Sequence, residues 1–167
     1  MEELIYNQCQ IPKEQWRYGL RSSAATGCGW IATHNALRLM DLPSEPEKLI
    51  REYTRQLPLI HGNTGTSIFG VYRYFKKCGF SVDLTLRRKD FDEAVKGVPV
   101  AILFYRWRQK WKLGAHFVAL HHTEAGFIGY NTYRTSNGPD HYGQSLATFL
   151  KRRKYFHCVL ITIEKTT

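Results

Sequence analysis

Residues 26–31 read TGCGWI, and they open an apolar stretch that predicts a helix from Gly29 or Trp30 to Met40. A cysteine at the start of a helix lies among backbone N–H groups without partners, at the positive end of the helix dipole. Both features stabilise a thiolate, which makes Cys28 a candidate nucleophile. Gly27 and Gly29 would let the chain bend and leave the sulfur accessible. On this evidence alone, Cys28 could equally be an ordinary small residue.

The order of elements around this helix predicts the fold class. Further helices are expected within 44–57, 66–79, 90–95 and 145–151. Strands are expected at 80–86, 99–104, 116–121, 127–130 and 156–163. The first 20 residues are irregular, and 61–65 is a loop. Helices followed by a mostly antiparallel sheet predict an α+β fold whose early helices pack on one side of the sheet.

Length and composition favour one folded domain over residues 1–167. Hydrophobic residues make up 43% and aromatic residues 14%, which argues against disorder. The longest uncharged apolar run, 98–105, is far shorter than the roughly 20 residues of a membrane span. The first residues show no secretory signal, so we expect a cytoplasmic protein.

The cysteines and histidines do not suggest a metal site. The four cysteines contain no CxxC pair, and we expect free thiols in a reducing compartment. His121 and His122 are neighbours on a strand, so their side chains point to opposite faces and cannot easily share an ion. No metal and no cofactor are therefore expected.

The charge favours an acidic partner, which could be nucleic acid, anionic lipid or an acidic peptide, and a solvated basic surface explains it equally well. There are 24 Lys and Arg against 14 Asp and Glu, a net charge of +10. Residues 106–112 form a basic stretch that contains Trp107 and Trp111. It could stack on nucleic-acid bases, or be a hairpin edge guarded by charge. Because it precedes His116, we favour a rim that binds an acidic, peptide-like substrate over nucleic acid. The basic residues 151–154 are expected to be a solvated helix end.

A histidine and an asparagine complete a candidate triad with Cys28. His116 begins one expected strand, and Asn131 ends the next one after a short turn at 123–126. Such strands are antiparallel neighbours, so the two residues are expected side by side. The Asn131 amide oxygen could accept a hydrogen bond from one ring N–H and leave the other nitrogen facing the thiol. A lone histidine is more often a core residue, and the Asn131 pairing raises the weight of the catalytic interpretation.

In this order the motifs resemble papain-like cysteine peptidases, most closely the double-glycine peptidases that cut leader sequences from bacteriocin precursors. Cys28-Gly29 resembles the nucleophile motif, and Asn131 stands where such enzymes place Asp or Asn. The segment that leads from Gly65-Thr66-Ser67 into a helix closed by Cys78-Gly79-Phe80 resembles the middle helix and turn of this family. Residues 98–103 with 116–120 resemble its strand pair that carries the histidine. The resemblance covers roughly residues 20–163 and implies a papain-like fold with a Cys-His-Asn triad.

The sequence departs from this family at the oxyanion donor. The family usually has a glutamine about six residues before the cysteine, where this chain has Ser22, followed by Ser23. Either hydroxyl could donate instead, whereas Gln8, Gln10 and Gln15 would need a different chain path. The expected substrate contacts are Gly27, Trp30, Trp107, Trp111, Gly114 and Ala115.

Two functions remain open at this stage. The first is a cysteine peptidase or acyltransferase, in which His116 takes the Cys28 proton or holds a thiolate–imidazolium pair. The second is a weak or inactive module on the same scaffold, which binds a peptide or nucleic acid through the basic aromatic stretch.

Overall fold

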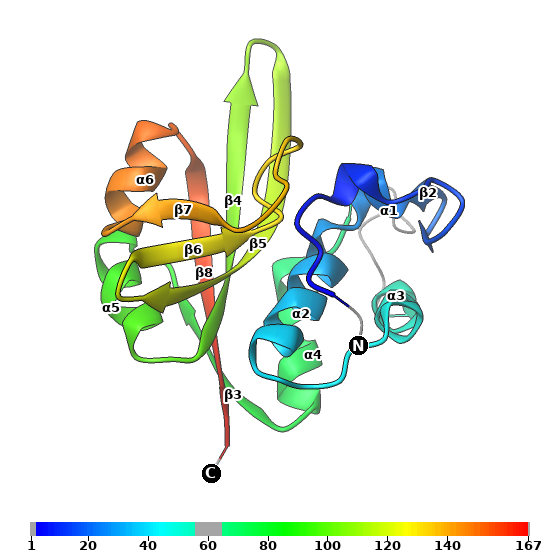
Figure 1. Cartoon of the computed structure of the whole chain (residues 1–167), viewed down its shortest axis with the longest axis horizontal. Coiled ribbons are helices and arrows are strands. Elements are labelled where there is room, and N and C mark those ends of the chain that lie inside the picture. The colour runs from blue at the N-terminus through cyan, green and yellow to red at the C-terminus, as the bar shows by residue number, and fades with distance from the viewer. Residues whose placement is uncertain (1–2, 56–64, 167) are drawn as a thin grey trace.

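The computed structural model describes residues 3–55 and 65–166 (Figure 1). The helices are α1 (Ser23–Thr26), α2 (Cys28–Leu39), α3 (Pro46–Arg55), α4 (Ile68–Lys77), α5 (Phe91–Lys96) and α6 (Leu146–Arg152), with short 3-10 turns η1 (Gln8–Gln10) and η2 (Arg88–Asp90). The strands are β1 (Arg17–Tyr18), β2 (Arg21–Ser22), β3 (Phe80–Thr85), β4 (Val100–Gln109), β5 (Lys112–Thr123), β6 (Gly126–Tyr130), β7 (Asp140–Gly143) and β8 (Phe156–Lys165).

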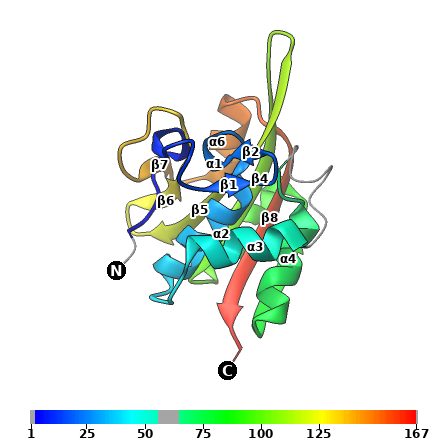
Figure 2. The ribbon, with the colours of Figure 1, turned by 90° about the vertical axis from the view of Figure 1, so that its right-hand side faces the viewer.

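A six-stranded antiparallel sheet divides the molecule into two halves. Its strand order is β3-β8-β4-β5-β6-β7, and β1 and β2 form a separate two-stranded ribbon. Helices α1 to α4 lie on one side of the sheet, and α5 and α6 lie on the other (Figures 1 and 2). This arrangement confirms the predicted α+β class with the early helices on one side.

Each face of the sheet has its own hydrophobic core, because side chains alternate along β4 and β5. Phe104 and Phe117 lie in the core shared with α2, α3 and α4. Tyr105 and Val118 lie in the core shared with α5 and α6. Strands covered on both faces are apolar at successive positions, as β4 is from Val100 to Tyr105.

The starts of two expected helices differ in their side-chain contacts. Ser67 caps α4 by accepting a hydrogen bond of 2.9 Å from the backbone N–H of Gly70. The α3 helix begins at Pro46, and the Ser44 hydroxyl before it lies 2.9 Å from Nδ1 of His34. The expected end of α3 before Pro58 and the loop at 61–64 lie outside the described residues.

The basic stretch 106–112 is a β-hairpin rather than a loop. Strand β4 continues to Gln109 and β5 begins at Lys112, with a two-residue turn between them. Trp107 pairs across the hairpin with Gly114, where an added Cβ would lie 2.2 Å from the indole. The indole therefore occupies the space that a side chain at Gly114 would need.

None of the helices among residues 3–55 and 65–166 is both long and apolar enough to cross a bilayer. Within the same residues, His, Cys, Asp and Glu side chains form no group of three that could hold a metal ion.

Candidate active site

Cys28 is the first residue of α2, and its half-buried sulfur faces β5. Backbone N–H groups of Phe117, Gly29 and Cys28 itself lie around the sulfur and favour the thiolate. Burial opposes them more strongly and raises the pKa of the Cys28 thiol to about 11. The thiol is therefore neutral at pH 7, which corrects the expectation that the helix start alone would produce a thiolate.

The glycines beside Cys28 are needed for packing. A Cβ on Gly27 would lie 2.5 Å from the carbonyl oxygen of Ser23, and one on Gly29 would lie 2.3 Å from Oγ1 of Thr66. Gly27 has an ordinary helical φ of −80°, so it does not provide the unusual bend expected from the sequence. Thr66 is in turn held by Tyr18, whose hydroxyl lies 3.0 Å from Oγ1. These contacts fix the start of α2 against the segment that precedes α4.

His116 lies on β5 with one ring nitrogen already engaged. Its Nε2 is 2.5 Å from the backbone carbonyl oxygen of Asn131. A carbonyl oxygen only accepts, so Nε2 carries the proton and the neutral ring keeps a free lone pair on Nδ1. Burial, together with the charge of Arg134, lowers the pKa of the His116 imidazole against the opposing effect of the Asn131 hydrogen bond. The ring is therefore a neutral base at rest.

The candidate nucleophile and the candidate base are connected only through a neighbouring residue. The Cys28 sulfur meets the N–H of Phe117, the residue after His116. His116 pairs with Tyr105, 5.9 Å away between ring centroids, and shares its face of the sheet. Among the hydrogen bonds of the described residues, none links the Cys28 sulfur to the His116 ring.

The edge of β5 is open where His116 lies. Strand β6 pairs with β5 only from Ala119 onward. Among the described residues, no strand pairs with β5 at His116 on that side.

Asn131 uses a different atom from the one predicted. Its backbone carbonyl meets His116, whereas its carboxamide bonds to Gln8. Oδ1 accepts from the Gln8 backbone N–H at 2.8 Å, and Nδ2 donates to Gln8 Oε1 at 3.1 Å. Asn131 has a positive φ of 65°, a conformation that asparagine tolerates better than most residues. The expected amide-to-ring hydrogen bond is therefore replaced by a carbonyl-to-ring bond.

Gln8 lies beside the site, along a chain path that no sequence pattern predicted. Besides its contacts with Asn131, it donates through Nε2 to the carbonyl oxygen of Ala24 in α1, at 3.0 Å. It precedes Cys28 by twenty residues, so no local spacing links the two. The short turn η1, held by the Asn7 side chain, presents Gln8 to both halves of the site.

The two serines expected as oxyanion donors are placed differently from each other. Ser23 is fully buried, and its Oγ accepts from Trp30 Nε1 at 3.1 Å, so its hydroxyl does not face a substrate. Ser22 is half-buried before α1 and makes no side-chain capping bond. Of the two, Ser22 alone stays a candidate.

The residues expected to contact substrate also fall into two groups, one buried and one on the hairpin. Trp30 is fully buried and packs edge-on against Trp16, with 5.5 Å between ring centroids, so it is a core residue. Gly27 is also buried. The other four lie on the hairpin beyond His116, where their role as a rim stays a prediction: Trp107, Trp111, Gly114 and Ala115.

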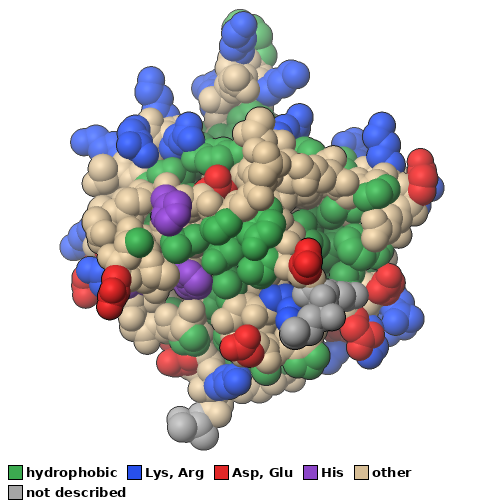
Figure 3. All heavy atoms as spheres, viewed as in Figure 1, with side chains coloured by type: hydrophobic (Ala, Val, Ile, Leu, Met, Phe, Trp, Pro, Cys, Tyr) green, Lys and Arg blue, Asp and Glu red, His purple; other side chains and the backbone are tan. Residues whose placement is uncertain are grey.

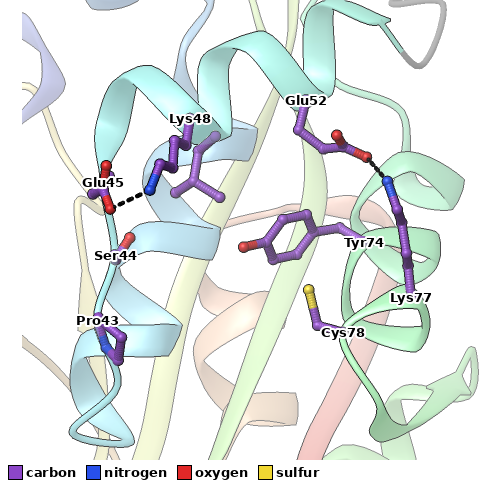
Figure 4. Close-up of a pocket in the computed structure, with 9 residues that line it drawn as sticks. Pro43, Ser44, Glu45, Lys48, Glu52, Tyr74, Lys77 and Cys78 are labelled. Carbon is purple, nitrogen blue, oxygen red and sulfur yellow. Dashed lines mark hydrogen bonds and ion pairs between the residues drawn. The ribbon is translucent and has the colours of Figure 1, made fainter.

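A pocket of about 370 Å³ lies away from these residues, between the segment before α3, α3 itself and the end of α4 (Figure 4). Two ion pairs flank it, Glu45 with Lys48 at 2.6 Å and Glu52 with Lys77 at 2.8 Å. Burial raises the pKa of the Tyr74 phenol, which lies beside the Cys78 thiol in this pocket. No histidine is among the described residues that line this pocket, so we place the candidate chemistry at Cys28.

Comparison with known proteins identifies the fold. No family model matches the sequence, and no curated protein matches it. Among solved structures, the chain is similar to the peptidase domain of Streptococcus ComA, a bi-functional ABC transporter involved in a quorum-sensing pathway. The match has a TM-score of 0.57 and 12% identity, and it covers 85% of this chain and 93% of that domain. The fold predicted from the sequence is thus confirmed, and it is that of a papain-like peptidase domain.

Proposed function

We propose that the protein is a papain-like cysteine hydrolase or acyltransferase that acts on a peptide-like substrate, with Cys28 as its nucleophile. The observation that carries this proposal is the contact of the Cys28 sulfur with the N–H of Phe117, directly after His116. Thiol chemistry needs a base near the sulfur, and this contact brings the strand that carries His116 next to Cys28. The peptidase-domain fold supports the same class of reaction.

The charge states favour a general-base mechanism. Both the thiol and the imidazole are neutral at rest, because burial raises the pKa of Cys28 and lowers that of His116. In the proposed reaction His116 turns across the open edge of β5, and its Nδ1 takes the thiol proton as the sulfur attacks the carbonyl carbon. His116 then gives this proton to the leaving group, and water or an amine releases the acyl group from Cys28.

Asn131 and Gln8 have supporting roles in this proposal. The Asn131 carbonyl fixes the ring tautomer that leaves Nδ1 free, and Gln8 holds Asn131 in place. The backbone N–H of Cys28 would stabilise the oxyanion, together with the side chain of Ser22 or Gln8. The resemblance in sequence motifs favours substrates with a double-glycine cleavage site.

A simple ester tests the nucleophile without knowledge of the substrate. The protein is incubated with 4-nitrophenyl acetate, and the acetyl adduct is located by peptide mass spectrometry. We expect acetylation of Cys28 that is lost in Cys28→Ala and slowed about 10²-fold or more in His116→Ala. Cys9→Ala is the matched control, because Cys9 is exposed and outside the site.

Two results would contradict the proposal. One is equal acetylation of the four cysteines, and the other is an unchanged Cys28 rate in His116→Ala. If Cys28 reacts as proposed, a peptide with an internal Gly-Gly is offered next, and its cleavage or transfer products separate hydrolysis from acyl transfer.

One observation favours a second candidate, a binding module without catalysis. The buried thiol with its pKa of about 11 and the ring of His116 turned to Tyr105 describe a site that is not assembled for attack. This candidate predicts that acetylation of Cys28 only follows its thiolate fraction, rising about tenfold for each pH unit below 10, and is the same in His116→Ala. It also predicts that peptide binding is the same in the parent protein and in Cys28→Ser.

A further inference from the structure

Two basic segments that are 39 residues apart or more in the chain meet at one end of the sheet. The first is the hairpin 106–112, and the second is the end of α6 and the turn after it, 151–154. Arg106 pairs with Phe156 across β4 and β8, which places the start of the hairpin beside the second segment. The stacked rings of Tyr105 and Tyr155, 4.1 Å apart, hold the same junction. We call these two segments together the cationic end.

The cationic end carries concentrated and unneutralised charge. Its Lys and Arg side chains are all exposed, and its two segments contain no Asp or Glu. None of these cations takes part in the ion pairs found among the described residues. Blue side chains crowd the top of the molecule in Figure 3, where the hairpin projects. The eight cations are Arg106, Arg108, Lys110, Lys112, Lys151, Arg152, Arg153 and Lys154.

The tip of the hairpin adds exposed apolar side chains. Trp111 is 97% exposed in the turn, and Leu113 beside it is 69% exposed. Lys110 and Lys112 flank Trp111 on either side. The hairpin extends beyond the rest of the fold in both ribbon views, so its tip can meet a flat surface before the body does (Figures 1 and 2).

We propose that the cationic end binds the surface of a membrane rich in anionic lipid. An indole at a projecting tip fits the headgroup level of a bilayer, where tryptophan is favoured. Lys110 and Lys112 beside the indole would meet lipid phosphates, and each cation near an anionic surface adds to the attraction. The other cations lie nearer the base of the hairpin, at the side of the body that faces the same surface, and this distribution fits a broad planar polyanion. The proposal does not depend on chemistry at Cys28.

The partial burial of Trp107 argues against single-stranded nucleic acid as the partner of this surface. Binding of bases needs several free ring faces along a basic groove. Trp107 is half-buried and covers Gly114, so its ring is committed to the hairpin. Trp111 alone offers an open ring, which suits insertion at one point better than stacking along a strand.

Vesicle binding tests the proposal directly. The full chain is sedimented with vesicles of phosphatidylcholine alone and with vesicles containing 30% phosphatidylglycerol. We expect binding to the anionic vesicles that is at least 10-fold stronger and that weakens as salt rises from 50 to 300 mM. Lys110→Glu/Lys112→Glu should reduce it at least 10-fold, and Trp111→Ser several-fold. Brominated lipid should quench the fluorescence of the parent protein more than that of Trp111→Ser.

The matched control carries the same charge change elsewhere. Arg73→Glu/Lys76→Glu alters exposed residues of α4, at the opposite end of the molecule (Figure 1), and should bind nearly as the parent does. Equal losses of vesicle binding in the two double variants would show that net charge alone accounts for the binding, and this would overturn the proposal. So would unchanged binding in Trp111→Ser. Tighter binding to a 12-nucleotide DNA strand than to anionic vesicles would assign the surface to nucleic acid instead.

Discussion

Gln8 and Asn131, 123 residues apart, are joined by two hydrogen bonds. The backbone N–H of Gln8 reaches Oδ1 of Asn131, and the Asn131 amide returns a bond to the Gln8 side chain. The pair ties the N-terminal segment to the end of β6, beside the carbonyl that holds His116. The geometry of the candidate base therefore depends on a residue near the start of the chain.

Gln8→Ala should destabilise the protein by about 1–3 kcal/mol, because it leaves a buried amide without its partner. Asn131 is only 2% exposed, so water cannot replace the lost acceptor easily. Urea unfolding measures the change. Gln10→Ala is the control, since its 3.1 Å bond to Asn137 is exposed, and it should cost about 0.5 kcal/mol or less. Equal losses of stability in the two variants would show that the buried Gln8 contact contributes no more than the exposed Gln10 contact.

Alkylation of Cys28 by iodoacetamide should become faster with rising pH up to at least pH 10. Only the thiolate reacts, and burial holds the pKa of this thiol at about 11. The rate should therefore increase about tenfold for each pH unit between 7 and 10. Mass spectrometry of Cys28 over this range gives the profile. A plateau that begins below pH 9 would mean that the resting thiol is activated.

Gly29→Ala should destabilise the start of α2 by about 1–3 kcal/mol, although alanine normally favours a helix. The reason is the Thr66 side chain, which would lie 2.3 Å from the new methyl group. Thermal unfolding gives the cost. Gly138→Ala, which meets no atom within 4 Å, should change stability little. The double variant Gly29→Ala/Thr66→Gly should lose less than the sum of its single changes, and strict additivity would refute the contact.

Stability should fall as the pH drops from about 6.5 to 5.5. Burial lowers the pKa of His34 and of His116 below the usual value of 6.5. The unfolded chain takes up protons at about 6.5 and the folded chain resists them, so acid favours unfolding in this window. Urea midpoints should show a loss of about 1 kcal/mol. The loss should shrink in His34→Gln and persist in the exposed control His157→Gln, and a pH-independent midpoint would contradict it.

The helices and inner strands could be predicted because the spacing of their apolar residues indicates which side chains are buried. Leu103 and Phe104 alternate between two cores, and the sequence pattern gave β4 up to that point. Beyond it the polar run from Arg106 looked like a loop, whereas pairing such as Trp107 with Gly114 extends the strand. Pairing between strands depends on the partner as well as on the local pattern.

The site was only partly predictable for a related reason. Strand order placed His116 beside Asn131, but a left-handed backbone at Asn131 decides which atom meets the ring. Nothing local signals the contact with Gln8, which forms across the whole fold. The charge of Cys28 likewise depends on how deeply β5 covers it, and burial outweighs the helix start that the sequence shows.

Strand β5 also fixes the distance between the exposed tip of the hairpin and the backbone beside Cys28. It runs without interruption from Lys112, beside the exposed Trp111, to Phe117 and on to Thr123. At about 3.3 Å per residue, the five steps from Lys112 to Phe117 span about 17 Å. A chain anchored at the plane where the tip rests would need roughly five extended residues to reach the sulfur. If the tip rests on a membrane and Cys28 is the nucleophile, as proposed above, the length of this hairpin sets the height above that plane at which a tethered peptide bond can meet Cys28.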